Sequence, residues 1–129
     1  MPSELKYLAC AVCLGLVYVL LAATLSTAQR GLPWNVGNRD GDSKPLTGAA
    51  ARAHRASRNF LETFPFFAAA VLGVVLAKTS SAHTALGAQL YLWARLIYLP
   101  VYVIGIPYLR TLVWAVSLVG LLQVLWALF

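Results

Sequence analysis

Charged residues are scarce in this sequence. Asp, Glu, Lys and Arg together make up 11% of the 129 residues, whereas a soluble domain has about 25%. Apolar residues make up 60%, and a chain of this length cannot bury that excess in one core. The composition therefore excludes a soluble monomer, a disordered chain and a coiled coil. It leaves a small polytopic membrane protein with a single domain over residues 1–129.

Residues that bind metals or form disulfides are also few. The two cysteines, Cys10 and Cys13, lie one helical turn apart inside an apolar run, without the strand–helix–strand context of a redox motif. Cysteines in such places commonly serve as small hydrophobic residues. The two histidines, His54 and His83, have no second His, Cys or acid at ligand spacing. We therefore expect no metal site, no disulfide-rich module and no redox dithiol.

The net charge of +6 arises from ten basic and four acidic residues. Six of the ten basic residues lie between Arg30 and Arg58, where they flank apolar segments. A nucleic-acid binder presents a solvated basic face instead, whereas flanking cations are typical of membrane proteins. We expect no nucleic-acid partner.

Four apolar segments are long enough to cross a membrane, which takes about 20 residues of α-helix. They run over residues 5–27, 49–78, 82–104 and 107–129. A polar stretch over residues 29–47, rich in Gly and Pro, is predicted to be a loop. Sustained alternation of polar and apolar residues, which strands require, is absent. The predicted fold is an all-α membrane protein, a bundle of four transmembrane helices.

The loop cations predict the orientation of this bundle. The first loop and the start of the second segment hold six basic residues, whereas the opposite side holds Lys6 and Lys78. By the positive-inside rule, we expect the loop over residues 28–50 in the cytoplasm and both termini outside.

Three ionisable residues, Arg58, Glu62 and Arg95, fall at membrane depth, where charges normally face a partner or a wet cavity. The spacing places two polar groups of residues on one helix face each: Arg55, Arg58, Asn59 and Glu62 on the second segment, and Tyr91, Arg95, Tyr98 and Tyr102 on the third. Glu62 and Arg95 each lie ten residues from the same membrane side, about 15 Å deep at about 1.5 Å per residue. We therefore infer a Glu62–Arg95 ion pair, within the bundle or between subunits. A pair that only fixes helix register is the alternative interpretation.

A cationic pocket is predicted on the cytoplasmic side of this pair. Its residues are Arg55, Arg58, Asn59, Tyr98, Tyr102 and Arg110. Such a pocket suits a small anionic ligand held by forked arginine contacts. The alternative is that these cations bind lipid phosphates at the membrane surface.

The second segment opens with the motif RAHRASRNFLETFP over residues 52–65. It resembles the signature of the MAPEG family, the membrane-associated proteins in eicosanoid and glutathione metabolism: Arg, two residues, Arg-Ala, two residues, Asn, two residues, Glu, and Pro shortly after. Ala94-Arg95 with Tyr98 and Tyr102, and then Arg110-Thr111, extend the resemblance over the four-helix layout.

This resemblance implies a homotrimer, with glutathione as co-substrate bound between neighbouring subunits and with no metal. It implies that one subunit contacts the tripeptide through Arg55, Arg58, Asn59 and Glu62, and that the site is completed, in part from the neighbour, by Arg30, Tyr98, Tyr102 and Arg110. Arg95 is counted with these binding residues. By the same likeness Arg110 holds the thiol as thiolate, and Thr111 stands where some relatives have a serine, so these two are the candidate catalytic residues.

Two functions from different classes follow. The first is a glutathione-dependent integral membrane transferase or peroxidase, in which the thiolate attacks a lipophilic electrophile or hydroperoxide arriving from the bilayer. The second is a non-catalytic membrane subunit or lipid-binding scaffold, which keeps the trimer and the anion pocket and has phospholipids as partners.

Overall fold

Five helices make up the computed structural model, which describes all 129 residues. They are α1 (Ser3–Arg30), α2 (Leu32–Val36), α3 (Gly48–Leu76), α4 (Ala82–Ile104) and α5 (Pro107–Trp126). No residue lies in a strand, which confirms the all-helical prediction. The long helices follow the four predicted segments within a few residues. The short α2 contradicts the prediction of a loop without helix over residues 29–47, because Pro33 sits in the first turn, where a missing N–H costs nothing.

Local sequence signals set the ends of α4. Ser81 and Thr84 form a reciprocal capping box, in which each side chain bonds to the backbone of the other residue at the start of the helix. At its other end, Gly105 adopts a left-handed conformation with φ +93° and donates its N–H to the C=O of Val101 at 3.1 Å. Pro107 then occupies the first position of α5.

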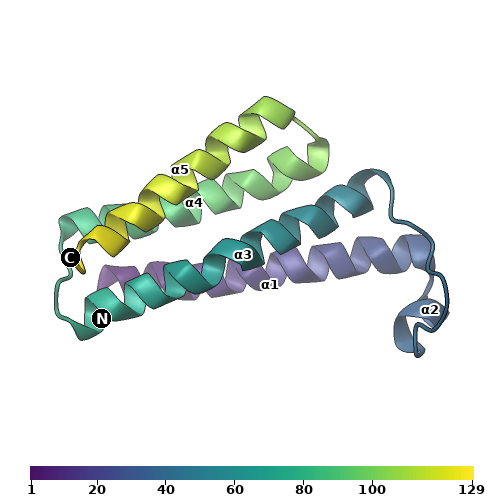
Figure 1. The fold of residues 1–129 in the computed structure, drawn as a ribbon, viewed down its shortest axis with the longest axis horizontal. Helices are drawn as coiled ribbons and strands as arrows, with labels where there is room; N and C mark the ends of the chain where they lie inside the picture. Colours follow the sequence, from purple (N-terminus) through teal and green to yellow (C-terminus); the bar gives the residue numbers. More distant parts are fainter.

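The long helices pair as two antiparallel hairpins, α1 with α3 and α4 with α5, and α3 also contacts α4 and α5 (Figure 1). Both chain termini lie at one end of the bundle. The α4–α5 turn and the loop that leads into α3 lie at the other end (Figure 1).

Helices α1, α3 and α5 are long and apolar enough to cross a membrane. Helix α4 has 23 residues, but Gln89, Arg95 and three tyrosines make it less apolar. Large apolar side chains cover the outside of the bundle; Leu16, Leu76 and Leu112 are 58%, 82% and 63% exposed. Such a surface is what a lipid environment accommodates and water does not.

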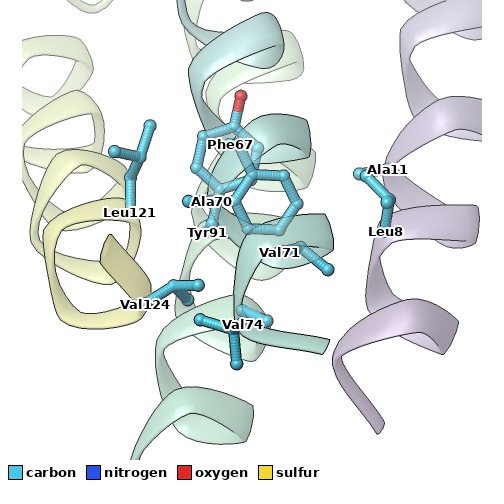
Figure 2. Close-up of a cluster of buried hydrophobic side chains, with 10 residues drawn as sticks. Leu8, Ala11, Phe67, Ala70, Val71, Val74, Tyr91, Leu121 and Val124 are labelled. Atoms are coloured by element: carbon cyan, nitrogen blue, oxygen red, sulfur yellow. The ribbon is translucent and has the colours of Figure 1, made fainter. Parts of the chain in front are cut away.

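The core near the termini is built from all four long helices. Figure 2 shows Leu8 and Ala11 of α1 on one side and Leu121 and Val124 of α5 on the other, with residues of α3 and α4 between them. Phe67 of α3 and Tyr91 of α4 stack at its centre, with ring centroids 3.9 Å apart. The hydroxyl of Tyr91 exchanges a hydrogen bond with Thr63 at 3.0 Å, so the buried phenol is satisfied.

Glu4 is a buried acid that the sequence pattern does not single out. It is 2% exposed, and its carboxylate accepts a hydrogen bond from the hydroxyl of Thr84 at the start of α4. An anion is favourable there, because the first turn of a helix carries partial positive charge. Glu4 therefore anchors the beginning of α1 to the beginning of α4.

Glycine allows α4 and α5 to approach closely. A Cβ added to Gly120 would lie 2.5 Å from the carbonyl oxygen of Gly87, and one added to Gly87 would lie 2.7 Å from the carbonyl oxygen of Gly120. Both atoms that would be struck belong to backbone, so a side chain cannot simply rotate away. Small residues at such crossings are a common device of membrane helix packing.

Gly120→Ala is therefore expected to separate α4 from α5 and to destabilise the protein by about 1–3 kcal/mol, the usual cost of overpacking. Thermal unfolding in detergent measures the effect. Ala115→Leu is the control, since Ala115 is exposed on the same helix and should tolerate the larger side chain. Equal unfolding temperatures for the two variants would contradict the close crossing.

Candidate functional site

The most polar hollow of the molecule lies between α3, α4 and α5, at the end of the bundle opposite the termini. It has a volume of about 390 Å³ and is lined by Arg55, Arg58, Asn59, Glu62, Tyr98, Tyr102 and Arg110. We call it the arginine pocket. It contains all six residues of the predicted cationic pocket, together with Glu62.

Helix periodicity explains how these residues meet. The four from α3 recur at intervals of three and four residues, and Tyr98 and Tyr102 of α4 lie four apart, so each group forms one stripe. Arg110 follows Pro107 in the first turn of α5, which places it beside the last turn of α4. The site therefore stands on rigid helices instead of loops.

Tyr102 lies between two guanidinium groups that come from different helices. Arg55 donates from Nε to its hydroxyl at 3.2 Å, and the Cζ of Arg110 lies 4.7 Å from its ring centroid. Stacking on an aromatic face holds an arginine without occupying its N–H groups. Arg110 therefore keeps its donors available to a ligand.

The arginine pocket has a positive charge balance, since its lining holds three arginines and one carboxylate, Glu62. Guanidinium groups form paired hydrogen bonds with carboxylates and phosphates. The phenols and the Asn59 amide add neutral donors and acceptors. This arrangement can bind an anionic molecule that also carries one cationic group.

Arg95 lies behind the pocket wall and is fully buried, with 0% exposure. Its Nη1 donates to Oδ1 of Asn59 at 2.8 Å. Its Cζ lies 4.4 Å from the ring centroid of Tyr98, 5.3 Å from that of Phe60 and 5.7 Å from that of Tyr18. We call this set of three rings and Asn59 the aromatic cage.

The predicted Glu62–Arg95 ion pair is wrong. Arg95 has Asn59 as its side-chain partner, and its Nε and Nη2 have none, while Glu62 is exposed and faces the arginine pocket. Within this one chain, Arg95 is completely buried and presents no surface to a neighbouring subunit. The two residues are similarly deep, but the guanidinium turns to the aromatic cage.

Tyr18 was not among the predicted site residues, although it completes the cage. Its hydroxyl donates to the backbone carbonyl of Arg95, and its ring stacks on Phe60 with centroids 4.7 Å apart. These contacts join α1, α3 and α4 at one level. A tyrosine near the middle of an apolar segment was the available sequence signal, but nothing in its spacing points to Arg95.

Two other predicted site residues, Thr111 and Arg30, lie outside the arginine pocket, and so does Arg52, which belongs to the motif but is not a predicted site residue. Thr111 is exposed, and its hydroxyl donates to the carbonyl of Pro107 at 3.4 Å. Arg52, the first residue of the motif, donates to the C=O of Val103 at 2.7 Å and so satisfies a carbonyl in the last turn of α4. Arg30 donates to the C=O of Lys44 at 2.9 Å.

Arg30 belongs to a second hollow of about 350 Å³ between α1, α2 and α3. We call it the basic groove. Its lining includes Arg30, Arg39, His54 and Arg58 together with apolar residues such as Val19 and Leu61. Arg58 lines both hollows. Within one chain, Arg30 and the arginine pocket therefore lie on different sides of α3.

A comparison with protein families finds one match, the model of the MAPEG family, over residues 7–129. That range includes every residue of the arginine pocket and of the aromatic cage. No curated protein matches the chain.

Proposed function

Because this chain belongs to the MAPEG family, we propose that it is a glutathione-dependent integral membrane transferase or peroxidase acting on lipophilic electrophiles or hydroperoxides. The observation that carries the proposal is the arginine pocket, in which three arginines and one carboxylate from α3 and α5, with two tyrosines from α4, face a single hollow.

Glutathione fits this charge pattern. At neutral pH it carries two carboxylates, one ammonium group and a thiol. Arg55 and Arg58 suit the carboxylates, because a guanidinium binds them through two parallel hydrogen bonds. Glu62 is the one acid in the lining and suits the ammonium group. No metal takes part in the proposed chemistry.

Arg110 is the residue that we assign to the thiol. It lies in the first turn of α5, where the helix adds partial positive charge, and a cation beside a thiol lowers the thiol pKa. The neighbouring Thr111 is a further candidate donor to the sulfur, once its hydroxyl turns from Pro107. Leu109 and Leu112, which are 41% and 63% exposed, offer an apolar approach from the bilayer.

The reaction balances without a further cofactor. With an electrophile, the thiolate forms a carbon–sulfur bond and the leaving group departs with its electron pair. With a hydroperoxide, the thiolate attacks the terminal oxygen, the O–O bond breaks, and the alkoxide is protonated to an alcohol. The resulting sulfenic acid condenses with a second glutathione to give the disulfide and water.

The proposed assembly is a homotrimer. In each subunit α4 crosses the membrane together with α1, α3 and α5, which makes four membrane spans. The basic groove supports the homotrimer: Arg30 can join an arginine pocket only if it comes from a neighbouring chain, and Arg58 lines both surfaces. The excess of basic residues around α2 supports a cytoplasmic position for this end of the bundle.

Cross-linking in mild detergent should stop at three chains, whereas a dominant monomer or dimer would remove the shared site.

A non-catalytic, lipid-binding scaffold is the second candidate. The basic groove favours it, since three arginines and His54 beside Val19 and Leu61 suit the phosphate and the first methylenes of a phospholipid. In that case the arginine pocket would not activate a thiol.

Arg110→Ala separates the two candidates. A cation within about 4–6 Å lowers the pKa of an acid by about 1–3. An unassisted thiol, with a pKa of about 8.5, is still about 3% ionised at pH 7, so the loss of Arg110 should reduce the thiolate of bound glutathione by about 10- to 30-fold. Conjugation of an aromatic electrophile should fall in parallel, and the deficit should shrink at high pH, where the thiol ionises unaided. Glutathione affinity should change less, because Arg55, Arg58 and Asn59 remain. Thr111→Ala should have the smaller effect.

Ultraviolet absorbance of the thiolate, titrated against pH in wild type and Arg110→Ala, provides the measurement. The same thiol pKa in both proteins would reject the role of Arg110. A thiol pKa in wild type equal to that of free glutathione would favour the scaffold.

A further inference from the structure

Arg95 combines complete burial with incomplete pairing. Its exposure is 0%, its Nη1 donates to Asn59, and its Nε and Nη2 have no hydrogen-bond partner. A buried charge is costly unless it is paired. Three aromatic faces stabilise the cation, but Asn59 supplies its one hydrogen bond between side chains.

This contact decides how the Asn59 carboxamide is turned. A guanidinium has N–H donors and no acceptor, so the atom of Asn59 that faces Arg95 must be the oxygen. The carboxamide nitrogen is then directed away from Arg95. It has no partner in the chain and is not among the buried, unpaired atoms, and Asn59 lines the arginine pocket.

We propose that Arg95 is a positioning residue, which turns the Asn59 carboxamide so that its NH₂ group faces the arginine pocket as a donor to a carboxylate or carbonyl of the bound anion. The identity of that anion as glutathione rests on the proposed function. The orientation of the carboxamide rests on the hydrogen bond from Arg95 to Asn59 alone.

Because Arg95 binds the oxygen of Asn59, Asn59 presents a hydrogen-bond donor to the ligand and not an acceptor. The terminal torsion of an asparagine is broad, and a carboxamide turned by half a rotation would present its oxygen to an anion. Arg95 disfavours that second orientation, because the carboxamide NH₂ group would then point its two N–H donors at a cation. Arg95 also polarises the amide, which strengthens the outer N–H donors. Its stacking on Tyr98, a lining residue, holds a second wall of the pocket in place.

Asn59→Asp tests this orientation, because it has opposite effects on stability and on binding. One carboxylate oxygen would replace the amide oxygen at Arg95 and give the buried cation a counter-charge, so the unfolding temperature in detergent should rise by about 2–8 °C. The other oxygen would replace the NH₂ group in the arginine pocket and repel the anion. The Kd for glutathione, from titration calorimetry, should therefore rise about tenfold or more, or about 1.4 kcal/mol.

Asn59→Leu is the matched control, since it keeps the size of the side chain and removes both polar atoms. It should lower the unfolding temperature and weaken glutathione binding. A fall in stability for Asn59→Asp comparable to that for Asn59→Leu would overturn the orientation, and an unchanged affinity in Asn59→Asp would overturn its role in binding.

Variants of Arg95 provide the second readout. Arg95→Lys keeps the charge and a donor and should hold the glutathione Kd within about threefold of wild type, whereas Arg95→Met should raise it about tenfold. Combining Arg95→Met with Asn59→Asp should abolish the stabilisation by the aspartate; persistence of that stabilisation would mean that the pocket arginines cause it. Where Arg95→Met does not fold, the comparison of Asn59→Asp with Asn59→Leu decides.

The two proposals fail in different ways. If wild-type protein binds no glutathione, the proposed function fails, while the opposite stability effects of Asn59→Asp and Asn59→Leu still decide the orientation. If wild type binds glutathione and Asn59→Asp binds it equally well, only the positioning role fails.

Discussion

A single buried cation organises the middle of this bundle. Tyr18 from α1, Phe60 from α3 and Tyr98 from α4 surround the guanidinium of Arg95, and Tyr18 also binds its backbone carbonyl. Removing such a charge from water is tolerable only when its surroundings hold it in one geometry. These contacts fix the relative positions of α1, α3 and α4 beside the arginine pocket. The surroundings of Arg95 therefore also position Asn59 and Tyr98, which line that pocket.

Much of the fold and of the pocket could be predicted because both follow from one-dimensional patterns. The apolar segments, Ser81, Gly105 and Pro107 locate the ends of the helices, and helical periodicity places Arg58 and Glu62 on one stripe. The partner of Arg95 could not be predicted in this way. Counting residues predicts how far along its helix a residue lies and on which helix face. Whether Arg95 contacts Glu62 or the aromatic cage depends on the rotation of the helices and on cation–π contacts, and residue spacing predicts neither.

Two buried contacts between distant positions also escape prediction from the sequence. Tyr18 and Arg95 lie 77 positions apart and Glu4 and Thr84 lie 80 apart, so the benefit of each pair appears only after the helices have packed. Helix α2 was missed because it is a five-residue helix in a segment whose Gly and Pro content favours turns. Arg30 was grouped with the pocket by resemblance, whereas in one chain it lies in the basic groove.

Titrating glutathione into the purified protein in detergent and measuring the heat shows whether the arginine pocket binds glutathione. We expect saturable binding that Arg58→Ala weakens by about tenfold or more, the scale of a lost contact to a charged group. Lys78→Ala is the charge-matched control, because Lys78 is exposed at the other end of the bundle, and it should bind as wild type does. No binding to wild type at millimolar glutathione, or equal affinity in Arg58→Ala, would mean that the arginine pocket is not a glutathione site.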